Sequence, residues 1–195
     1  MNPVTHGLLS WLVACGLPNS CKRDRALITV AGLAPDLDGF GLVTEFFTRN
    51  SAHPNLWWTN YHHALCHNLA TCCVIVLLAI PFARRRGMVA LLMFVTFHVH
   101  LLCDVVGAKG PDGEHWPIPY FAPFSDAVQW TWEHQWALNG WPNIVITVAA
   151  MAATFFLAWK RGYSPLEMVS LRADAAVVDT LRRRFSSQER WSRGE

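Results

Sequence analysis

The stretch "MVALLMFVTFHVHLLCD", residues 88–104, is an apolar run that carries two histidines and an aspartate near its end. It predicts a helix whose length is at the lower limit of the about 17–25 residues that cross a bilayer. His98, His100 and Asp104 must have partners there, because a buried polar group left unsatisfied costs about 1–3 kcal/mol. What these side chains bind is the main question that the sequence raises.

Four other segments of the chain have the same apolar character. They predict helices over residues 4–17, 25–36, 64–83 and 143–159, of which the last, "NIVITVAAMAATFFLAW", is the strongest membrane candidate. The composition agrees, because 52% of the residues are hydrophobic and 15% are charged, against about 25% charged in soluble domains. We therefore expect an all-α fold, an integral membrane bundle of about five helices. The two N-terminal segments are short enough to be buried core helices instead.

The charged residues are distributed unevenly along this expected bundle. If the chain runs up and down through the five helices, the basic clusters fall at one end and the histidines and aspartates at the other. The basic clusters are Lys22 to Arg25, Arg84 to Arg86, Lys160 with Arg161, and Arg182 to Arg184. By the positive-inside rule, the basic end is cytoplasmic and the His/Asp end faces the opposite side. Soluble helices joined by Arg-rich turns are the alternative, and the net charge of +2 gives no reason to expect a nucleic-acid partner.

Two long connections, residues 39–61 and 105–142, lie at the His/Asp end and have no clear periodicity. Loops of this length in a compact domain are usually functional or disordered, and their aromatic residues argue against disorder. Trp57, Trp58 and Trp116 within them suit an interfacial belt or a lid over a site.

We expect the chain to divide into a membrane-embedded domain, residues 1–162, and a basic cytoplasmic tail, residues 163–195. Part of the tail is typical either of an amphipathic helix on the membrane surface or of a frayed terminus. The N-terminal segment lacks the basic flank of a signal peptide, so we expect it to remain on the protein. The six cysteines include no CxxC pair and predict no disulfide framework.

Histidines and aspartates from four expected elements converge on the His/Asp end. His100 and Asp104 are four residues apart and share one helix face; His63 and His67 have the same spacing, whereas His62 lies on another face. Such nitrogen and oxygen atoms are typical ligands of zinc, manganese or iron, and an ionisable residue within a membrane is a functional candidate by default. The candidate metal ligands are His6, Asp36, Asp38, His62, His67, His100 and Asp104.

Three short motifs carry a resemblance to a known family. "PDLD" (35–38), "HHALCHN" (62–68) and "HLLCD" (100–104), with an early His6, look like those of the LexA-regulated, inner-membrane-associated, metal-dependent hydrolases. The likeness covers approximately residues 1–160. It implies a multi-pass protein of the bacterial inner membrane that uses a metal for hydrolysis.

The family pattern at the second motif is roughly His-Arg-x-x-Thr-His-Ser. Its two histidines match His62 and His67, and the acid of the family's HxxxD motif matches Asp104. This chain has His63 in place of the arginine, Cys66 in place of the threonine and Asn68 in place of the serine.

A more distant likeness is to the zinc-dependent phospholipases C and the S1/P1 nucleases, whose ligands also run in the order His, Asp, His, HxxxD. It implies a ligand set of His6, Asp36 or Asp38, His62 or His67, His100 and Asp104, with Asp104 able to bridge two ions. The later ligands of those enzymes have no clean match here. We therefore expect one or two ions, zinc ahead of manganese or iron.

The expected reaction is metal-assisted hydrolysis of a phosphoester or lipid-like substrate, because a bound ion lowers the pKa of its water to about 7. Asp36 or Asp38, whichever is not a ligand, is the expected catalytic base. The expected substrate-binding residues are His63, Trp57, Trp58 and Trp116. Membrane lipid is the expected partner, and the oligomeric state is left open.

Two alternatives belong to other functional classes. One is a non-enzymatic membrane protein with a structural metal site, which is closed by four protein ligands. The other is a proton-relay or transport protein that uses His98, His100 and Asp104 within the membrane. Because His98 lies on a different helix face from His100, the metal hypothesis expects it not to be a ligand.

Overall fold

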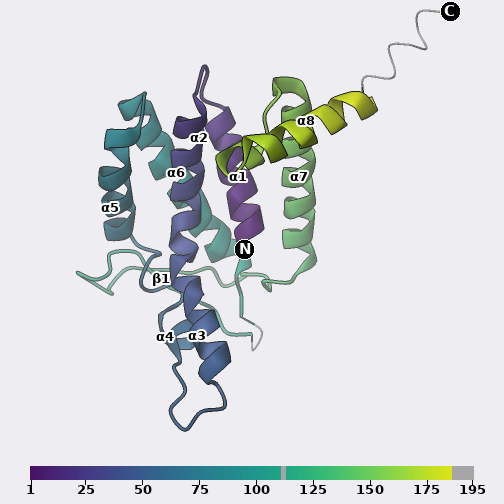
Figure 1. Cartoon of the computed structure of the whole chain (residues 1–195). Helices are drawn as coiled ribbons and strands as arrows, with labels where there is room; N and C mark the ends of the chain where they lie inside the picture. The colour runs from purple at the N-terminus through teal and green to yellow at the C-terminus, as the bar shows by residue number, and fades with distance from the viewer. Residues whose placement is uncertain (111–112, 186–195) are drawn as a thin grey trace, which may run out of the picture.

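The computed structural model describes residues 1–110 and 113–185 as upright helices with an extension at one end (Figure 1). All five predicted helices are present. They are α1 (Pro3–Cys15), α2 (Lys22–Leu33), α5 (Leu69–Ala79), α6 (Arg86–Gly107) and α7 (Trp141–Arg161). Helix α2 packs against both α1 and α6, and α1 also contacts α7. The expected all-α bundle is therefore confirmed.

The outer surface of the bundle is suited to a membrane. Among the described residues, three helical segments are long and apolar enough to span a bilayer, namely Lys22–Thr48, Arg86–Gly107 and Trp141–Arg161. Helices α1 and α5 are apolar but shorter, at 13 and 11 residues. Leu77 and Leu78 of α5 are each 69% exposed. Exposed apolar surface of this kind is unfavourable in water, whereas in a bilayer it contacts acyl chains.

The helices approach each other closely where small residues meet. Gly32 of α2 lies so near its neighbours that a Cβ there would collide with Ser10 of α1 and crowd Thr96 of α6. Thr96 Oγ1 also donates a hydrogen bond of 3.0 Å to the carbonyl of Ile28. Small residues and interhelical hydrogen bonds are the usual basis of helix association in membranes. This contact aligns the three helices that carry much of the site.

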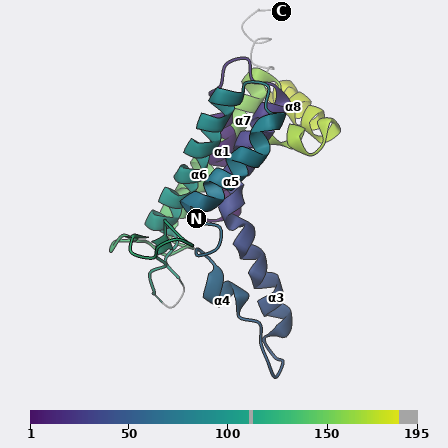
Figure 2. The same cartoon turned by 90° about the vertical axis from the view of Figure 1, so that its left-hand side faces the viewer.

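Helix α2 and the two helices that follow it form one continuous helical rod, which extends past the bundle (Figure 2). It passes through a 3-10 helix, η1 (Ala34–Phe40), into α3 (Gly41–Thr48), and α4 (Trp57–Tyr61) follows after a turn. The prediction that residues 39–61 form a loop is therefore wrong for much of its length. Pro35 lies in the first turn of η1, where proline is tolerated. The apolar pairs at 42–43 and 46–47 recur at the helical spacing of four, a signal that the sequence interpretation overlooked.

Helix α5 begins at Leu69, later than the predicted start at residue 64. The Asn68 side chain accepts a hydrogen bond of 2.9 Å from the Thr71 N–H and caps the helix. The helix ends in a short 3-10 turn, η2 (Ile80–Phe82). Residues 62–68 therefore form a turn rather than the first residues of the helix. His62, His63 and His67 are thus carried by this turn and not by a helix face.

The connection from α6 to α7 covers one end of the bundle. Its described residues form only two short strands, β1 (Ile118–Pro119) and β2 (Gln129–Trp130), which pair antiparallel. Asn143 Nδ2, at the start of α7, donates hydrogen bonds of 2.7 Å to the carbonyls of Gly107 and Leu138 and so holds both ends of the connection. A long connection without helices is confirmed for the described part of this segment.

The C-terminal segment contains η3 (Pro165–Met168) and α8 (Leu171–Phe185). Arg25 of α2 forms a doubly hydrogen-bonded ion pair with Glu167, with both N–O distances at 2.6 Å. Its guanidinium also lies 3.9 Å over the ring of Tyr163. Helix α8 is amphipathic, as one of the two interpretations of the tail expects. Residues 186–195 of that predicted tail lie outside the described residues.

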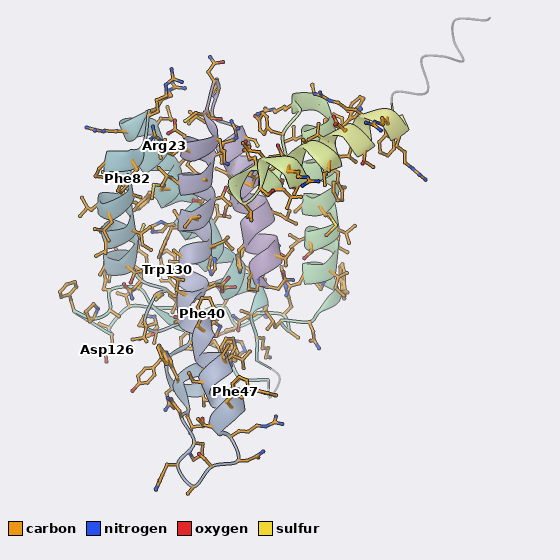
Figure 3. The ribbon with its side chains drawn as sticks, in the orientation of Figure 1. Arg23, Phe40, Phe47, Phe82, Asp126 and Trp130 are labelled. Carbon is orange, nitrogen blue, oxygen red and sulfur yellow. The ribbon has the colours of Figure 1, made fainter. Side chains whose placement is uncertain are left out.

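The two ends of the bundle differ as the charge pattern predicts. In Figure 3, Arg23 and Phe82 lie toward one end, and Trp130, Phe40 and Asp126 toward the other. The turn between α5 and α6 and the end of α7 bring Arg84 to Arg86 and Lys160 with Arg161 to the first end. We call this the basic end, and the opposite one the His/Asp end.

Candidate functional site

Buried histidines and carboxylates gather at the His/Asp end, beneath the α6–α7 connection. Among the described residues, two groups bring potential metal ligands together, and within each group the ligand atoms all lie within 4.8 Å of one another. The first group is His63, His67 and Asp104, and the second is His6, Asp36 and His100. His6, His67, His100 and Asp104 are at most 2% exposed.

Helix α6 supplies His100 and Asp104 from one face, as their spacing predicts. His100 Nε2 lies 3.0 Å from Asp104 Oδ2. On the other side of the ring, His100 Nδ1 lies 2.8 Å from the carbonyl oxygen of Gly32. Because a carbonyl only accepts, Nδ1 carries the proton and a neutral His100 has an unprotonated Nε2. The close approach of α2 at Gly32 therefore fixes the tautomer of this ring.

The turn at residues 62–68 supplies the other histidines, and not by the helix face that their spacing suggests. His63 has a left-handed backbone, with φ at 68°, which redirects the chain between α4 and α5. Asn68 Nδ2 donates a hydrogen bond of 2.8 Å to the Leu65 carbonyl and closes the turn. The predicted placement of His63 and His67 on one helix face is wrong, although the turn does bring both into the first group.

Asp38 supports this turn from η1. One carboxylate oxygen lies 2.9 Å from His62 Nδ1. The other lies 3.0 Å from His67 Nδ1 and accepts a bond of 3.2 Å from the Cys66 N–H. Both oxygens of Asp38 are therefore engaged, and neither Asp38 nor His62 belongs to the two groups.

The ring of His67 is oriented in the same way as that of His100. Its Nδ1 donates to the Asp38 carboxylate, so in the neutral ring Nε2 presents a lone pair. The Nε2 atoms of His67 and His100 are 3.3 Å apart, and His67 Nε2 is 3.5 Å from Asp104 Oδ2. His63 Nε2 is 3.9 Å from the same oxygen. Nitrogen and oxygen atoms that can coordinate a metal ion thus converge on one point.

The pKa values of the two turn histidines are shifted in opposite directions. Burial by itself lowers the pKa of His67, but the neighbouring carboxylates of Asp104 and Asp38 raise it to about 9. Burial and the nearby His67 hold the pKa of His63 well below its usual range. Without an ion, the first group therefore pairs a protonated His67 with a neutral His63, and a metal ion that binds His67 Nε2 displaces its proton.

The second group lies on the other side of Asp104. His6 stacks on His100 with ring centroids 3.6 Å apart, and its Nε2 lies 3.2 Å from Asp104 Oδ1. The amino group of Met1 contacts the same oxygen. Asp36 Oδ1 lies 3.7 Å from His100 Nε2, whereas Asp36 Oδ2 is buried without a partner. Asp104 Oδ1 thus faces His6 of the second group, whereas Oδ2 lies near both His67 of the first group and His100 of the second.

Two cavities adjoin the cluster. One of about 570 Å³ reaches Asp36, His62 and His63 and is otherwise lined mainly by apolar residues such as Phe40 and Leu42. The other, of about 700 Å³, includes the polar residues Thr59, Asn60, Glu114 and Gln129 in its lining. Trp58, His62 and Trp116 line both cavities. The cluster is thus reached through space that is apolar on one side and mixed on the other.

The predicted substrate-binding residues have different surroundings. Trp58 stacks on His62 with ring centroids 3.7 Å apart and lines the cavities with Trp116. Trp57 packs closely over Gly41 and is not among the lining residues given for either cavity. His63 lies in a ligand group. His98 stands apart, with its Nε2 at 2.8 Å from the Tyr120 hydroxyl, as the metal hypothesis expects.

Sequence reasoning missed the residues that hold the cluster in place. Gly32 accepts from His100, and Gln135 Nε2 donates a hydrogen bond of 2.7 Å to the carbonyl of Asp104. Asn68 shapes the turn. Asn68 precedes an apolar run and is a recognisable helix-capping residue. Nothing in the local sequence indicates that Gly32 pairs with His100 or that Gln135 pairs with Asp104.

Comparisons with known proteins place the chain in a family. No curated protein and no solved structure matches the chain. The model of the YdjM inner membrane protein family matches residues 1–178. An inner-membrane family is thus confirmed, whereas hydrolysis and regulation by LexA stay predictions. The chain, with its apolar helices and its His/Asp cluster, belongs to the YdjM inner membrane protein family.

Proposed function

We propose that this inner membrane protein is a metal-dependent hydrolase of phosphoester or lipid-like substrates. One observation carries the proposal, the convergence of His67 Nε2, His100 Nε2 and Asp104 Oδ2, with separations of 3.0–3.5 Å. In a tetrahedral site with bonds of about 2.0–2.1 Å, neighbouring ligand atoms are about 3.3 Å apart. The spacing therefore fits a zinc ion, and manganese or iron is the alternative.

In this proposal His67, His100 and Asp104 would hold one ion. His6 Nε2, which lies 3.2 Å from the other oxygen of Asp104, would be a donor for a second ion. When bound, such ions supply Lewis acidity and an activated water. Asp38 orients His67 by its hydrogen bond to Nδ1, the supporting role that carboxylates often have behind metal-bound histidines.

The cavity beside the cluster favours catalysis over a purely structural site. A structural zinc site is closed by four protein ligands, whereas a catalytic one keeps an open position. Asp36 and His63 both line the 570 Å³ cavity and belong to different ligand groups. A substrate in that cavity would therefore contact both ligand groups from the cavity side.

Asp36 suits the role of catalytic base better than Asp38. Its Oδ2 has no partner and its side chain is 16% exposed in the wall of the cavity. It can accept a proton from an attacking water, whereas both oxygens of Asp38 are already engaged. The apolar cavity wall suits the hydrocarbon part of a substrate and the mixed second cavity its polar part, with Trp58 and Trp116 between them.

Hydrolysis by the purified, zinc-loaded protein tests this function. We expect metal-dependent release of nitrophenol from bis(4-nitrophenyl) phosphate, or cleavage of phosphatidylglycerol in mixed micelles. Asp36→Asn should lower kcat by about 100-fold or more, because it removes the base, while Asp126→Asn on the exposed loop should leave kcat unchanged. Measurements at saturating zinc separate the loss of the base from weaker metal binding. A metal-loaded wild type that cleaves neither substrate would leave a structural metal site.

The proposed orientation has the basic end in the cytoplasm, by the positive-inside rule. A cysteine introduced at Ser51, between α3 and α4, should react in intact spheroplasts with an impermeant maleimide. One introduced at Arg85, between η2 and α6, should react only after lysis. The signal is measured above that of the parent chain, which has six free cysteines. Equal labelling of both variants in intact spheroplasts would contradict the orientation.

A further inference from the structure

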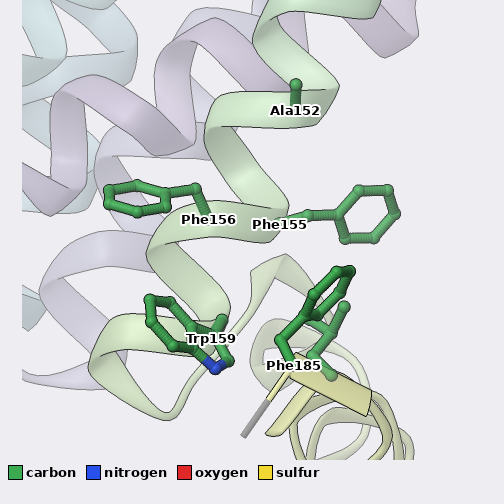
Figure 4. A pocket seen from close by; sticks show the side chains of 6 residues that line it. Ala152, Phe155, Phe156, Trp159 and Phe185 are labelled. Atoms are coloured by element: carbon green, nitrogen blue, oxygen red, sulfur yellow. The ribbon is translucent and has the colours of Figure 1, made fainter. Parts of the chain in front are cut away.

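A groove lies between α7 and α8, at the basic end and far along α7 from the His/Asp cluster (Figure 4). It has a volume of about 390 Å³ and an apolar lining. The lining residues are Ala152, Phe155, Phe156 and Trp159 of α7 with Leu181 and Phe185 of α8. Because α7 is a candidate membrane span, the groove lies where that span reaches the membrane surface.

Helix α8 forms one side of the groove because of how it is anchored. Asp174 accepts hydrogen bonds of 2.6 Å from the Ser164 N–H and hydroxyl, and Val178 is buried. Beyond these anchors the helix extends past α7, as Figure 1 shows. At its far end Phe185 is 61% exposed, and Phe155 of α7 is 47% exposed. The overhang therefore leaves a space between two apolar surfaces that no described residue fills.

Cations lie at the rim of this space. Lys160 Nζ lies 6.0 Å from the ring centre of Phe156, and Arg182 Nε donates a hydrogen bond of 3.2 Å to the Trp159 carbonyl. Two of the lining residues are thus in contact with a cation. The other charged residues in the last two turns of α8 are Asp179, Arg183 and Arg184.

We propose that this groove binds an anionic phospholipid of the leaflet at the basic end, with an acyl chain against Phe155 and the phosphate at Lys160 and Arg182. The apolar wall and the cationic rim of the groove are arranged in the same order as the acyl chain and the phosphate of a phospholipid, with the rim at the membrane surface. Basic residues at this level attract anionic lipids. The inference is independent of the proposed hydrolysis, because no residue of the groove belongs to the His/Asp cluster.

Native mass spectrometry of the full chain tests the binding. The protein is exchanged into micelles that contain equal amounts of dioleoyl phosphatidylglycerol and dioleoyl phosphatidylcholine. We expect the phosphatidylglycerol adduct to dominate, by about fivefold for each cation engaged. Lys160→Gln with Arg182→Gln should remove this preference, and Lys160→Gln alone should weaken it. Ala152→Phe, which fills the groove, should reduce the adducts of both lipids.

The control removes two charges from the same end of the bundle but on its other side. Arg84→Gln with Arg86→Gln alters the turn between η2 and α6, away from α8 (Figure 1), and should keep the preference. Equal retention of the two lipids by the wild type would overturn the proposal. A preference that survives Lys160→Gln with Arg182→Gln, or that falls equally in the control, would also overturn it, since the charge effect would then not belong to the groove.

Discussion

Asp104→Ala is expected to release the metal completely. The wild-type protein, purified in detergent and supplied with zinc, should hold about one or two equivalents. Asp104 is the residue that faces both ligand groups, with His6 of the second group 3.2 Å from one oxygen and His67 of the first group 3.5 Å from the other. Its loss removes a bridging ligand, so affinity should fall by more than about 100-fold, the upper range for residues that only support ligands. Elemental analysis after desalting measures the bound metal.

His98→Ala is the matched control for this measurement. His98 is a half-buried histidine of the same helix, but its ring hydrogen-bonds to the Tyr120 hydroxyl and the Phe94 carbonyl instead. The control variant should retain the wild-type metal content. Equal metal in Asp104→Ala and wild type would remove Asp104 from the site. No metal in either would return the cluster to a hydrogen-bonded or proton-relay role.

The part of the site that could be predicted from the sequence depends on local geometry. His100 and Asp104 are both within α6, so their spacing of four residues alone puts them on one face. The apolar runs likewise predict the five main helices, because helix length and hydropathy are local properties. His6 and Asp36 reach the same end because the chain runs up and down through the bundle, which the alternation of basic and His/Asp segments indicates.

The rest depends on contacts that are remote in the sequence. The turn that presents His63 and His67 requires a left-handed residue at His63, a conformation that is uncommon for residues other than glycine. The tautomer of His100 depends on a carbonyl of α2, which approaches closely only because Gly32 has no side chain. Neither condition leaves a pattern in the local sequence.

The different surroundings of Asp36 and Asp38 follow from η1. A 3-10 helix has three residues per turn, so side chains two positions apart point in different directions. Asp38 points to the turn histidines and is 2% exposed, whereas Asp36 reaches the cavity wall. The sequence "PDLD" alone leaves the two carboxylates equivalent. The proposed division between a supporting carboxylate and a catalytic one therefore rests on the 3-10 geometry.

Asp38→Asn is expected to weaken the metal without removing it. The amide keeps one acceptor oxygen but replaces the other with a donor, so it cannot accept from both His62 Nδ1 and His67 Nδ1. His67 then loses the negatively charged partner that fixes its tautomer and orientation, even where the amide oxygen still faces its Nδ1. Loss of such a supporting residue usually costs about 10–100-fold in metal affinity. Competition with a chromophoric zinc chelator measures the affinity of the variant against the wild type.

Glu45→Gln provides the comparison for this variant. Glu45 belongs to the same rod and accepts bonds of 3.0 and 2.7 Å from Thr59 of α4, so it ties the rod to α4 without touching either ligand group. Its substitution should leave zinc affinity unchanged. If Asp38→Asn and Glu45→Gln weaken zinc equally, the effect comes from a loosened α3–α4 extension. If Asp38→Asn matches the wild type, His67 needs no carboxylate partner, and Asp38 has no part in holding the metal.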